Sequence, residues 1–310
     1  MTRTGPLVAL LAAALLAVGC SSTPTNSSPP MDPAEAERID KLNRLSEYLA
    51  QAPPEDPDLL LNGLERMMIS WQTEQRQGRA RPLENLVNRK VVAGFEAVAD
   101  SFQHGPHERQ LVAAWALGFS RVPENPLGIP SRHEEALALL VPRLQEAPDD
   151  LMRNVTLALW KLGDPETPLP PVLELAVNHH DPDARANATL ALLSILRADS
   201  APLARDSVLV ALTDKEPKVR LHAAAVASRF PDPALTRRIH GLLREEESPL
   251  VRASMARALG KAKHRESTEL LVTMLGSPRA IETSSAHWAL VEIHGRDLGE
   301  TQEAWASLIE

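Results

Sequence analysis

One pattern in the second half of the chain constrains the fold more than any other feature. Arg153, Arg185, Arg220 and Arg252 follow one another at separations of 32, 35 and 32 residues. An apolar residue precedes each arginine, and mostly small or apolar residues follow it four and seven positions later. These offsets lie on one face of an α-helix with about 3.6 residues per turn. The spacing therefore predicts a helical unit that recurs along the chain.

The recurring helices have start signals and partners. A proline, which suits a first helical turn, stands three residues before the arginine in three units, and the residue before it is a candidate N-cap. These dipeptides are Asp181-Pro182, Glu216-Pro217 and Ser248-Pro249. After each first helix, a short break and a second apolar helix are expected around residues 172–175, 208–212, 239–243 and 270–275. With an earlier unit around Arg109 and a final one that has Glu282 at the arginine position, about six helix pairs run from His107 onward.

A period of this length with two helices per unit is typical of an α-solenoid. The segments Lys218–Ala224 and Leu250–Gly260 resemble the core of HEAT repeats, in the short form named after phycobilisome lyases. The resemblance implies an all-α fold but no particular activity, because HEAT arrays serve many roles. We therefore predict an α-solenoid of HEAT-like helix pairs with an N-terminal helical cap.

The chain before the repeats is divided by composition. Residues 33–52, a segment that begins at Asp56, and residues 83–102 are each expected to form a helix, with a polar end or loop at 72–81. They lack the repeat pattern and are predicted to cap the open end of the array. The expected organisation is a signal peptide at 1–19, a lipidated cysteine and tether at 20–32, the cap at 33–105 and the repeats at 106–310.

The N-terminus carries a targeting signal. Arg3 is followed by the apolar run Pro6–Val18, whose 13 residues are fewer than the roughly 20 that span a bilayer. Cys20 is the sole cysteine, which excludes an intrachain disulfide. Its position after Leu16–Gly19 resembles the lipobox of bacterial lipoproteins, which implies cleavage before Cys20 and its lipidation, with palmitate as a typical acyl group. An ordinary signal peptide with a chance cysteine is the alternative.

The segment after the cysteine supports an anchored protein. Residues 21–30 are Ser, Thr, Asn and Pro, a composition that cannot bury apolar surface and is typical of a flexible tether. Because Ser21 is not Asp, the lipoprotein resemblance implies that an inner-membrane retention signal is missing. The expected location is the bacterial envelope, with the outer membrane favoured in a cell that has two membranes.

The charge is distributed unevenly. Residues 215–265 hold 12 Lys or Arg and 5 Asp or Glu, a net charge of +7 in a chain of net charge −8, so the remainder sums to −15. This window predicts an electrostatic dock for an acidic partner, with an ordinary solvated surface as the alternative. We expected second helices to line the concave side and first helices to face outward. The candidate partner-binding residues are Arg237, Arg238, Arg244, Arg257 and Lys261.

No motif predicts catalysis or a cofactor. The chain lacks a Gly-x-Ser-x-Gly sequence, a phosphate-binding glycine-rich loop and paired carboxylates in a recognisable frame. The neighbours His179 and His180 do not supply three converging metal ligands. The pairs His107-Glu108 and His133-Glu134 resemble motifs of the HEAT-type deoxyhypusine hydroxylase, but that enzyme needs four such pairs in register. We therefore predict no catalytic residue, no metal and no cofactor.

Two further sets of residues are assigned to structure. The register arginines are expected to make polar contacts between repeats, with an Asp near the preceding turn, although a ligand-binding row is the alternative. The tryptophans at corresponding positions of first helices are expected to fill the core. They are Trp115, Trp160 and Trp288.

These observations predict a non-catalytic, lipid-anchored scaffold that binds an unknown and possibly acidic envelope protein. Nucleic acid is not expected as a partner, because that compartment lacks it and aromatic stacking residues are scarce. The alternative is a structural protein that docks anionic lipid or cell-wall polymer through the basic window. An undetected hydrolase or metal enzyme is the third hypothesis.

Overall fold

The computed structural model describes residues 33, 36–41, 44, 56–121 and 131–309, and among these it contains helices and no strands. The predicted all-α solenoid of helix pairs is confirmed. The chain divides into two compact units, Met1–Pro168 and Leu169–Glu310, which we call unit 1 and unit 2. Cys20 and most of the expected helix at 33–52 lie outside the described residues. Within the described part, no helix is both long enough and apolar enough to span a bilayer.

Unit 1 begins with the three-helix region that precedes the repeats. The side chain of Asp56 caps the first helix of this region by accepting the N–H groups of Asp58 and Leu59. Between residues 56 and 168, the described helices of unit 1 are α3 (Pro57–Arg76), α4 (Arg81–Ala93), α5 (Phe95–His104), α6 (His107–Leu117), α7 (His133–Leu140) and α8 (Asp149–Leu162), with a 3₁₀ turn at Val141–Leu144. The expected polar loop at 72–81 was wrong in part, because α3 continues to Arg76.

The expected single helix at 83–102 was also wrong. It is divided into α4 and α5 at Gly94, whose backbone leaves the helical region. A Cβ atom added at Gly94 would overlap Cδ2 of Leu60 on α3. The break therefore occurs where α3 packs too closely for any side chain larger than hydrogen.

The core of unit 1 contains an aromatic cluster. The Trp115 ring lies 6.0 Å from Trp71 and 4.8 Å from Phe119, and all three side chains are almost fully buried. The indole N–H of Trp71 donates to Glu84 at 2.8 Å, and the Lys161 ammonium donates to the same carboxylate oxygen at 2.6 Å. The polar tip of a large core residue is thus satisfied by a charge-assisted network.

Unit 2 is built from two alternating rows of helices. The first helices, which carry the register positions, are α10 (Pro182–Ile195), α12 (Pro217–Arg229), α14 (Pro249–Lys261) and α16 (Ala280–His294). The second helices are α9 (Leu169–Asn178), α11 (Arg205–Ala211), α13 (Pro233–Leu242), α15 (Thr268–Leu275) and the short α17 (Gln302–Trp305). Short 3₁₀ turns lie at Ala201–Ala204, Arg265–Ser267 and Ala306–Leu308. Each first helix packs on the next, and the second helices cover one side of that row.

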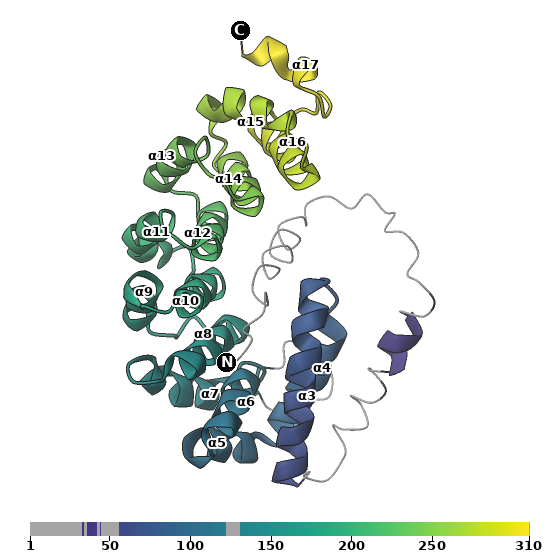
Figure 1. Ribbon diagram of the computed structural model, residues 1–310, viewed down its shortest axis with the longest axis vertical. Coiled ribbons are helices and arrows are strands. Elements are labelled where there is room, and N and C mark those ends of the chain that lie inside the picture. Colours follow the sequence, from purple (N-terminus) through teal and green to yellow (C-terminus); the bar gives the residue numbers. More distant parts are fainter. Residues whose placement is uncertain (1–32, 34–35, 42–43, 45–55, 122–130, 310) are drawn as a thin grey trace, which may run out of the picture. The chain divides into compact units, whose positions relative to one another are not determined.

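The rows of unit 2 bend so that the first helices lie on the inner side (Figure 1). Small residues explain the direction of the bend, because they let neighbouring first helices approach closely. Gly260 on α14 packs directly against Ala289 on α16, where an added Cβ would lie 2.8 Å from the Ala289 Cα. Our expectation that second helices line the concave side was therefore wrong for unit 2: the first helices line it, and the second helices form the outer side.

Two glycines of unit 2 give a matched test of this packing. Gly260→Ala is expected to destabilise the chain by about 1–3 kcal/mol, because α14 and α16 must separate to admit the methyl group. Gly241 on α13 has no atom near its added Cβ, and Gly241→Ala is expected to stabilise by up to about 1 kcal/mol through helix propensity. Urea denaturation of both variants checks the prediction, and equal shifts of the same sign would contradict it.

Candidate interaction surface

The register arginines of unit 2 join successive helix pairs. The Arg185 guanidinium donates from Nε and Nη2 to the two carboxylate oxygens of Asp214 at 2.8 and 3.0 Å. Its Nη1 donates to the carbonyls of His179 and His180 at 2.8 and 3.1 Å. Only 6% of the Arg185 side chain is exposed. The arginine thus connects the turn before α10 with the turn before α12.

Arg220 repeats this arrangement one pair later. It donates to both carboxylate oxygens of Glu246 at 2.7 Å and, through Nη1, to the carbonyls of Asp214 and Lys215. Burial raises the pKa of Glu246, but the hydrogen bonds from Arg220 and from the Ser248 N–H outweigh it, and the pKa lies below its ordinary value. The pKa of Asp214 is lowered in the same way. Both carboxylates are held ionised by their arginines.

The residues that precede each first helix, which include the two acids of this ladder, were missed in the sequence, although a signal marks them. Each of them stands three residues before the first residue of a first helix. Its side chain accepts a hydrogen bond from the backbone N–H of the residue two positions later. The residues are His179, Asp214, Glu246 and Ser277, with distances of 3.1, 2.8, 2.9 and 3.2 Å. The expected N-cap role holds for Asp181, which accepts the N–H of Ala184 at 2.8 Å, but Glu216 and Ser248 make no side-chain cap.

In the last step of the ladder, the acid comes from a different position. Ser277 occupies the acid position before α16, and Glu282 occupies the arginine position within it. The carboxylate of Glu282 accepts a hydrogen bond from the Ser277 hydroxyl at 2.7 Å, and the Arg252 Nε lies 3.4 Å from it. Glu282 is 3% exposed. The ion pair is kept, because Arg252 holds its usual position while the acid has moved from the turn into α16.

These contacts show that Arg185, Arg220 and Arg252 are structural and do not form a row open to ligands. The inter-repeat role predicted for them is confirmed, with one correction. The carboxylate comes from the following turn, and the preceding turn contributes backbone carbonyls to Arg185 and Arg220. The arginine is long enough to connect both turns, which explains why one residue type recurs at this position.

A second set of contacts joins the first helices. His222 is buried on α12, and its Nδ1 lies 2.8 Å from the carbonyl oxygen of Ala186 on α10. One unit later, the hydroxyl of Ser254 donates to the carbonyl of Leu221 at 3.3 Å. Burial lowers the pKa of His222 to about 4, although the hydrogen bond to Ala186 opposes this effect. His222 is therefore neutral at physiological pH.

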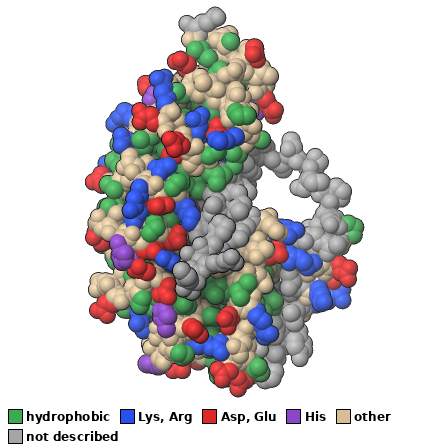
Figure 2. All heavy atoms as spheres, viewed as in Figure 1, with side chains coloured by type: hydrophobic (Ala, Val, Ile, Leu, Met, Phe, Trp, Pro, Cys, Tyr) green, Lys and Arg blue, Asp and Glu red, His purple; other side chains and the backbone are tan. Residues whose placement is uncertain are grey.

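The candidate partner-binding residues do not form a single patch. Arg237 and Arg238 are exposed on α13, in the outer row, and Arg244 is exposed in the turn just after it. None of the three makes an ion pair within the described part of the chain. Arg257 and Lys261 belong to α14, in the inner row. In the space-filling view, Lys and Arg side chains are distributed over unit 2 among Asp and Glu side chains (Figure 2). The outward orientation expected for the α14 pair was wrong.

Arg257 and Lys261 meet at a tryptophan instead. The Arg257 guanidinium carbon and the Lys261 ammonium lie 5.4 and 5.0 Å from the Trp288 ring centre, within the range of cation–π attraction. Trp288 is only half-buried, and so is Trp160. The expectation that all three tryptophans fill the core is confirmed for Trp115 alone.

Part of the basic excess is neutralised from outside the window. Lys218, Arg252 and Lys261 lie near carboxylates of residues that fall before or after residues 215–265. Those partners are Asp183, Glu282 and Glu292. Counting these three acids, the net charge of +7 falls to +4. The remaining excess includes the exposed arginines of α13.

The two His-Glu sequences do not build a common site. His107 Nε2 lies 2.7 Å from a carboxylate oxygen of Asp150, and His133 Nε2 lies 3.5 Å from one of Asp164. Each imidazole thus has a separate acid from later in unit 1, Asp150 in the first turn of α8 and Asp164 just after that helix. Neither interaction presents a nucleophile or a set of converging metal ligands.

Comparison with known proteins agrees with this architecture. Residues 205–291, from α11 to α16, match the family of HEAT repeats. No curated protein matches the chain. Two crystal structures of engineered proteins superpose with TM-scores of 0.52 and 0.51, at 18% and 17% identity. They cover 65% and 64% of this chain and 98% and 96% of their own lengths.

A third solved structure, human deoxyhypusine hydroxylase in complex with glycerol, is similar at 15% identity over 85% of this chain and 99% of its own length. Its TM-score of 0.35 is too low to carry an argument about activity. At these identities the engineered proteins indicate the fold alone. The described part of the chain is therefore an all-α solenoid of helix pairs, and its residues 205–291 match the family of HEAT repeats.

Proposed function

We propose that this protein is a non-catalytic scaffold that binds another protein in the bacterial envelope and is held at a membrane by a lipid on Cys20. The observation that carries the scaffold role is the exposure of Arg237, Arg238 and Arg244 on a rigid array whose structural arginines are already paired. Charged groups left on a rigid surface favour association with a partner of opposite charge. HEAT arrays commonly present such surfaces to other proteins.

The experiment that tests this role is cross-linking in intact cells, followed by purification of the protein under denaturing conditions. A specific envelope protein should be recovered, and its yield should fall when Arg237 and Arg238 are both changed to Glu. The matched control is Lys215→Glu, an exposed charge reversal outside α13. Recovery of no specific envelope protein, or equal recovery from all variants, would contradict the scaffold role.

The anchor gives a separate prediction. Cys20→Ser removes the thiol that would carry the first acyl group, so the variant is expected to leave the membrane fraction and become soluble. Several acyl chains are needed for stable anchoring, and their loss therefore releases the protein. Fractionation of cells, with a globomycin-treated culture as the control for lipoprotein processing, measures the effect. A variant that stays fully membrane-bound would refute the lipoprotein assignment.

A second candidate function is the docking of anionic lipid or cell-wall polymer. The same exposed arginines favour it, because polyanions bind arginine clusters mainly through charge. It predicts that the purified chain binds anionic polymer. This binding should weaken steeply as the salt concentration rises, and it should disappear in the double variant Arg237→Glu with Arg238→Glu. Salt-insensitive binding, or binding that survives the double reversal, would eliminate it.

A further inference from the structure

The second helices α11 and α13 of unit 2 expose equivalent but chemically different faces. Their buried residues coincide, with Ala204, Val208 and Leu212 matching Leu235, Ile239 and Leu243 at the same spacing of four. The exposed positions can therefore be matched as well. Leu203 and Val210 on the α11 side correspond to Ala234 and Gly241, while Asp206 and Thr213 correspond to Arg237 and Arg244. The α11 side thus carries an apolar stripe, and α13 with the turn after it carries a basic stripe.

The apolar stripe is unusually exposed. Leu203 and Val210 are 69% and 51% exposed, which places them among the most exposed large apolar side chains of the described residues. Leu203 lies on the 3₁₀ turn that leads into α11, and Val210 lies in the last turn of α11, so both belong to the surface of this second helix. Burying two such side chains against a partner would stabilise a complex by about 1.5–3 kcal/mol for each fully covered residue.

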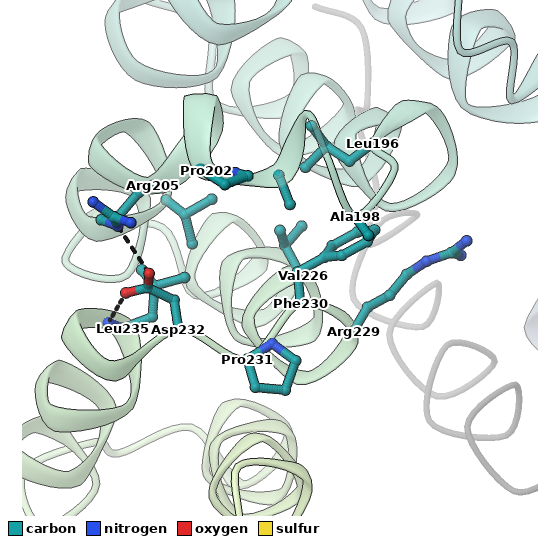
Figure 3. Close-up of a pocket in the computed structure, with 12 residues that line it drawn as sticks. Leu196, Ala198, Pro202, Arg205, Val226, Arg229, Phe230, Pro231, Asp232 and Leu235 are labelled. Carbon is teal, nitrogen blue, oxygen red and sulfur yellow. Dashed lines mark hydrogen bonds and ion pairs between the residues drawn. The ribbon is translucent and has the colours of Figure 1, made fainter.

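A hollow of about 300 Å³ opens beside this stripe, between the N-terminal ends of α11 and α13. Its floor is apolar and is formed by the buried side chains of Leu196, Val226 and Leu235, with Phe230 and Pro202 at the sides (Figure 3). Pro202 is the neighbour of Leu203 in the chain, so the stripe begins at the edge of the hollow. The hollow is also bordered by the inner row, because Leu196 directly follows α10 and Val226 and Arg229 belong to the last turn of α12.

The polar groups at the edge of the hollow are already satisfied. Arg205 Nε donates to Asp232 Oδ2 at 2.9 Å, while Asp232 Oδ1 caps α13 by accepting the N–H of Ala234 at 2.8 Å. Arg229 extends away from the hollow in Figure 3, and its guanidinium carbon lies 5.4 Å from the Phe230 ring centre. The hollow therefore offers no unpaired acid or base to a ligand, and it suits an apolar side chain.

From this arrangement we infer that the α11–α13 face binds an amphipathic helix of a partner protein that carries acidic residues along one flank. The apolar residues of that helix would cover Leu203 and Val210, with one side chain entering the hollow, as in helix-in-groove recognition. Its acidic flank would face the basic stripe of α13. The inference rests on the proposed scaffold function and names the face and the class of segment that it binds.

The charges decide between this occupant and others. Arg237, Arg238 and Arg244 are exposed and have no ion pair among the described residues, so a basic or neutral helix would leave them unmatched. A membrane surface would satisfy these cations, but a flat bilayer does not reach the floor of a hollow between two helices. An amphipathic helix with one acidic flank would cover the apolar stripe, place a side chain in the hollow and pair its acids with the arginines.

A synthetic peptide tests the inference on the full chain in detergent. The probe is a fluorescein-labelled helical peptide with Leu at positions i, i+3 and i+7 and Glu along one flank. The matched probe has Lys in place of each Glu. Binding is measured by fluorescence anisotropy for the unchanged chain, for Leu203→Ser with Val210→Ser, and for Arg237→Glu with Arg244→Glu. Leu59→Ser with Ile69→Ser is the control, because these two side chains are similarly exposed on α3 of unit 1.

The unchanged chain and the α3 control are expected to bind the acidic peptide equally. Each α11 or α13 double variant should lose about tenfold or more in affinity, as is typical when anchors of an interface are removed. The Arg237→Glu with Arg244→Glu variant should gain affinity for the Lys peptide. Equal binding of both peptides by the unchanged chain, or undiminished binding by the α11 variant, would overturn the inference.

Three further measurements separate the other occupants. Binding to vesicles containing phosphatidylglycerol but not to the peptide would favour a lipid and overturn the inference. A dimer in sedimentation equilibrium that is lost in Leu203→Ser with Val210→Ser would show that a second copy occupies the face. If photo-cross-linkers on α14 and α16 capture an envelope partner while those at positions 203 and 210 do not, the scaffold function stands and the α11–α13 face is wrong.

Discussion

Replacing Arg220 with Met is expected to destabilise the protein by about 3–5 kcal/mol, the usual cost of removing one partner from a buried ion pair. Glu246 would keep its charge with 4% of its side chain exposed, and it would lose both hydrogen bonds from the guanidinium. The carbonyls of Asp214 and Lys215 would lose a donor as well. The effect should appear as a lower urea midpoint monitored by circular dichroism.

Two companion variants show that the loss arises at this ladder. Adding Glu246→Gln to Arg220→Met removes the buried charge while keeping an acceptor for Ser248, and about 1–2 kcal/mol should be recovered. Arg238→Met on the surface of α13 should change stability by no more than about 0.5 kcal/mol. If Arg220→Met were no more damaging than Arg238→Met, the ladder would be an ordinary surface ion pair.

The helices and their pairing could be predicted because their causes are local. Apolar spacing around Arg185, Arg220 and Arg252, with a proline at each helix start, specifies a repeated amphipathic helix. Boundaries were less predictable where a distant contact decides them. Gly94 divides α4 from α5 because Leu60 packs against it from another helix, and no local pattern contains that information.

The partners of the arginines could not be obtained from periodicity alone. Asp214 lies 29 residues after Arg185, and Glu246 lies 26 residues after Arg220, so the pairing depends on how successive turns stack. A comparison of the positions three residues before each helix start would have found both acids. It would also have shown that the acid is missing at Ser277, because in the last unit the carboxylate moves into α16 as Glu282.

The inner side of the bend was predicted wrongly because the deciding residues were given too little weight. Ala253, Ala256 and Gly260 on α14 are small and almost fully buried, so neighbouring first helices can approach closely, and the close row is the one that must lie inside a bend. The five candidate binding residues then divide between the rows, with Arg237, Arg238 and Arg244 outside. The hollow beside α11 has no sequence signal, since it arises from the space between two helices.

The pH dependence of stability gives the second large effect. Because burial lowers the pKa of His222 from 6.5 to about 4, the folded chain holds it neutral while the unfolded chain takes up a proton as the pH falls below 6.5. Its contribution to stability is complete above pH 6.5 and is lost as the pH falls toward 4. The loss is on the order of 3 kcal/mol, since one pKa unit corresponds to about 1.4 kcal/mol.

His222→Asn should flatten the pH dependence of the free energy of unfolding. It should keep the contact with α10, because an amide can donate to the Ala186 carbonyl. Polar residues of this size fit here, since Asn187 and Ser254 stand at the equivalent positions of the neighbouring first helices. A residual slope of the same sign is expected from His264 and His294, whose pKa values burial also lowers. The carboxylates Asp214 and Glu246, whose pKa values the fold lowers, add to the slope only near and below their ordinary pKa values of 3.8 and 4.5, where the unfolded chain begins to take up protons. Urea midpoints measured between pH 7.5 and pH 4 test this, with exposed His104→Asn as the control, and an unchanged slope in His222→Asn would show that the imidazole of His222 is not held neutral by the fold.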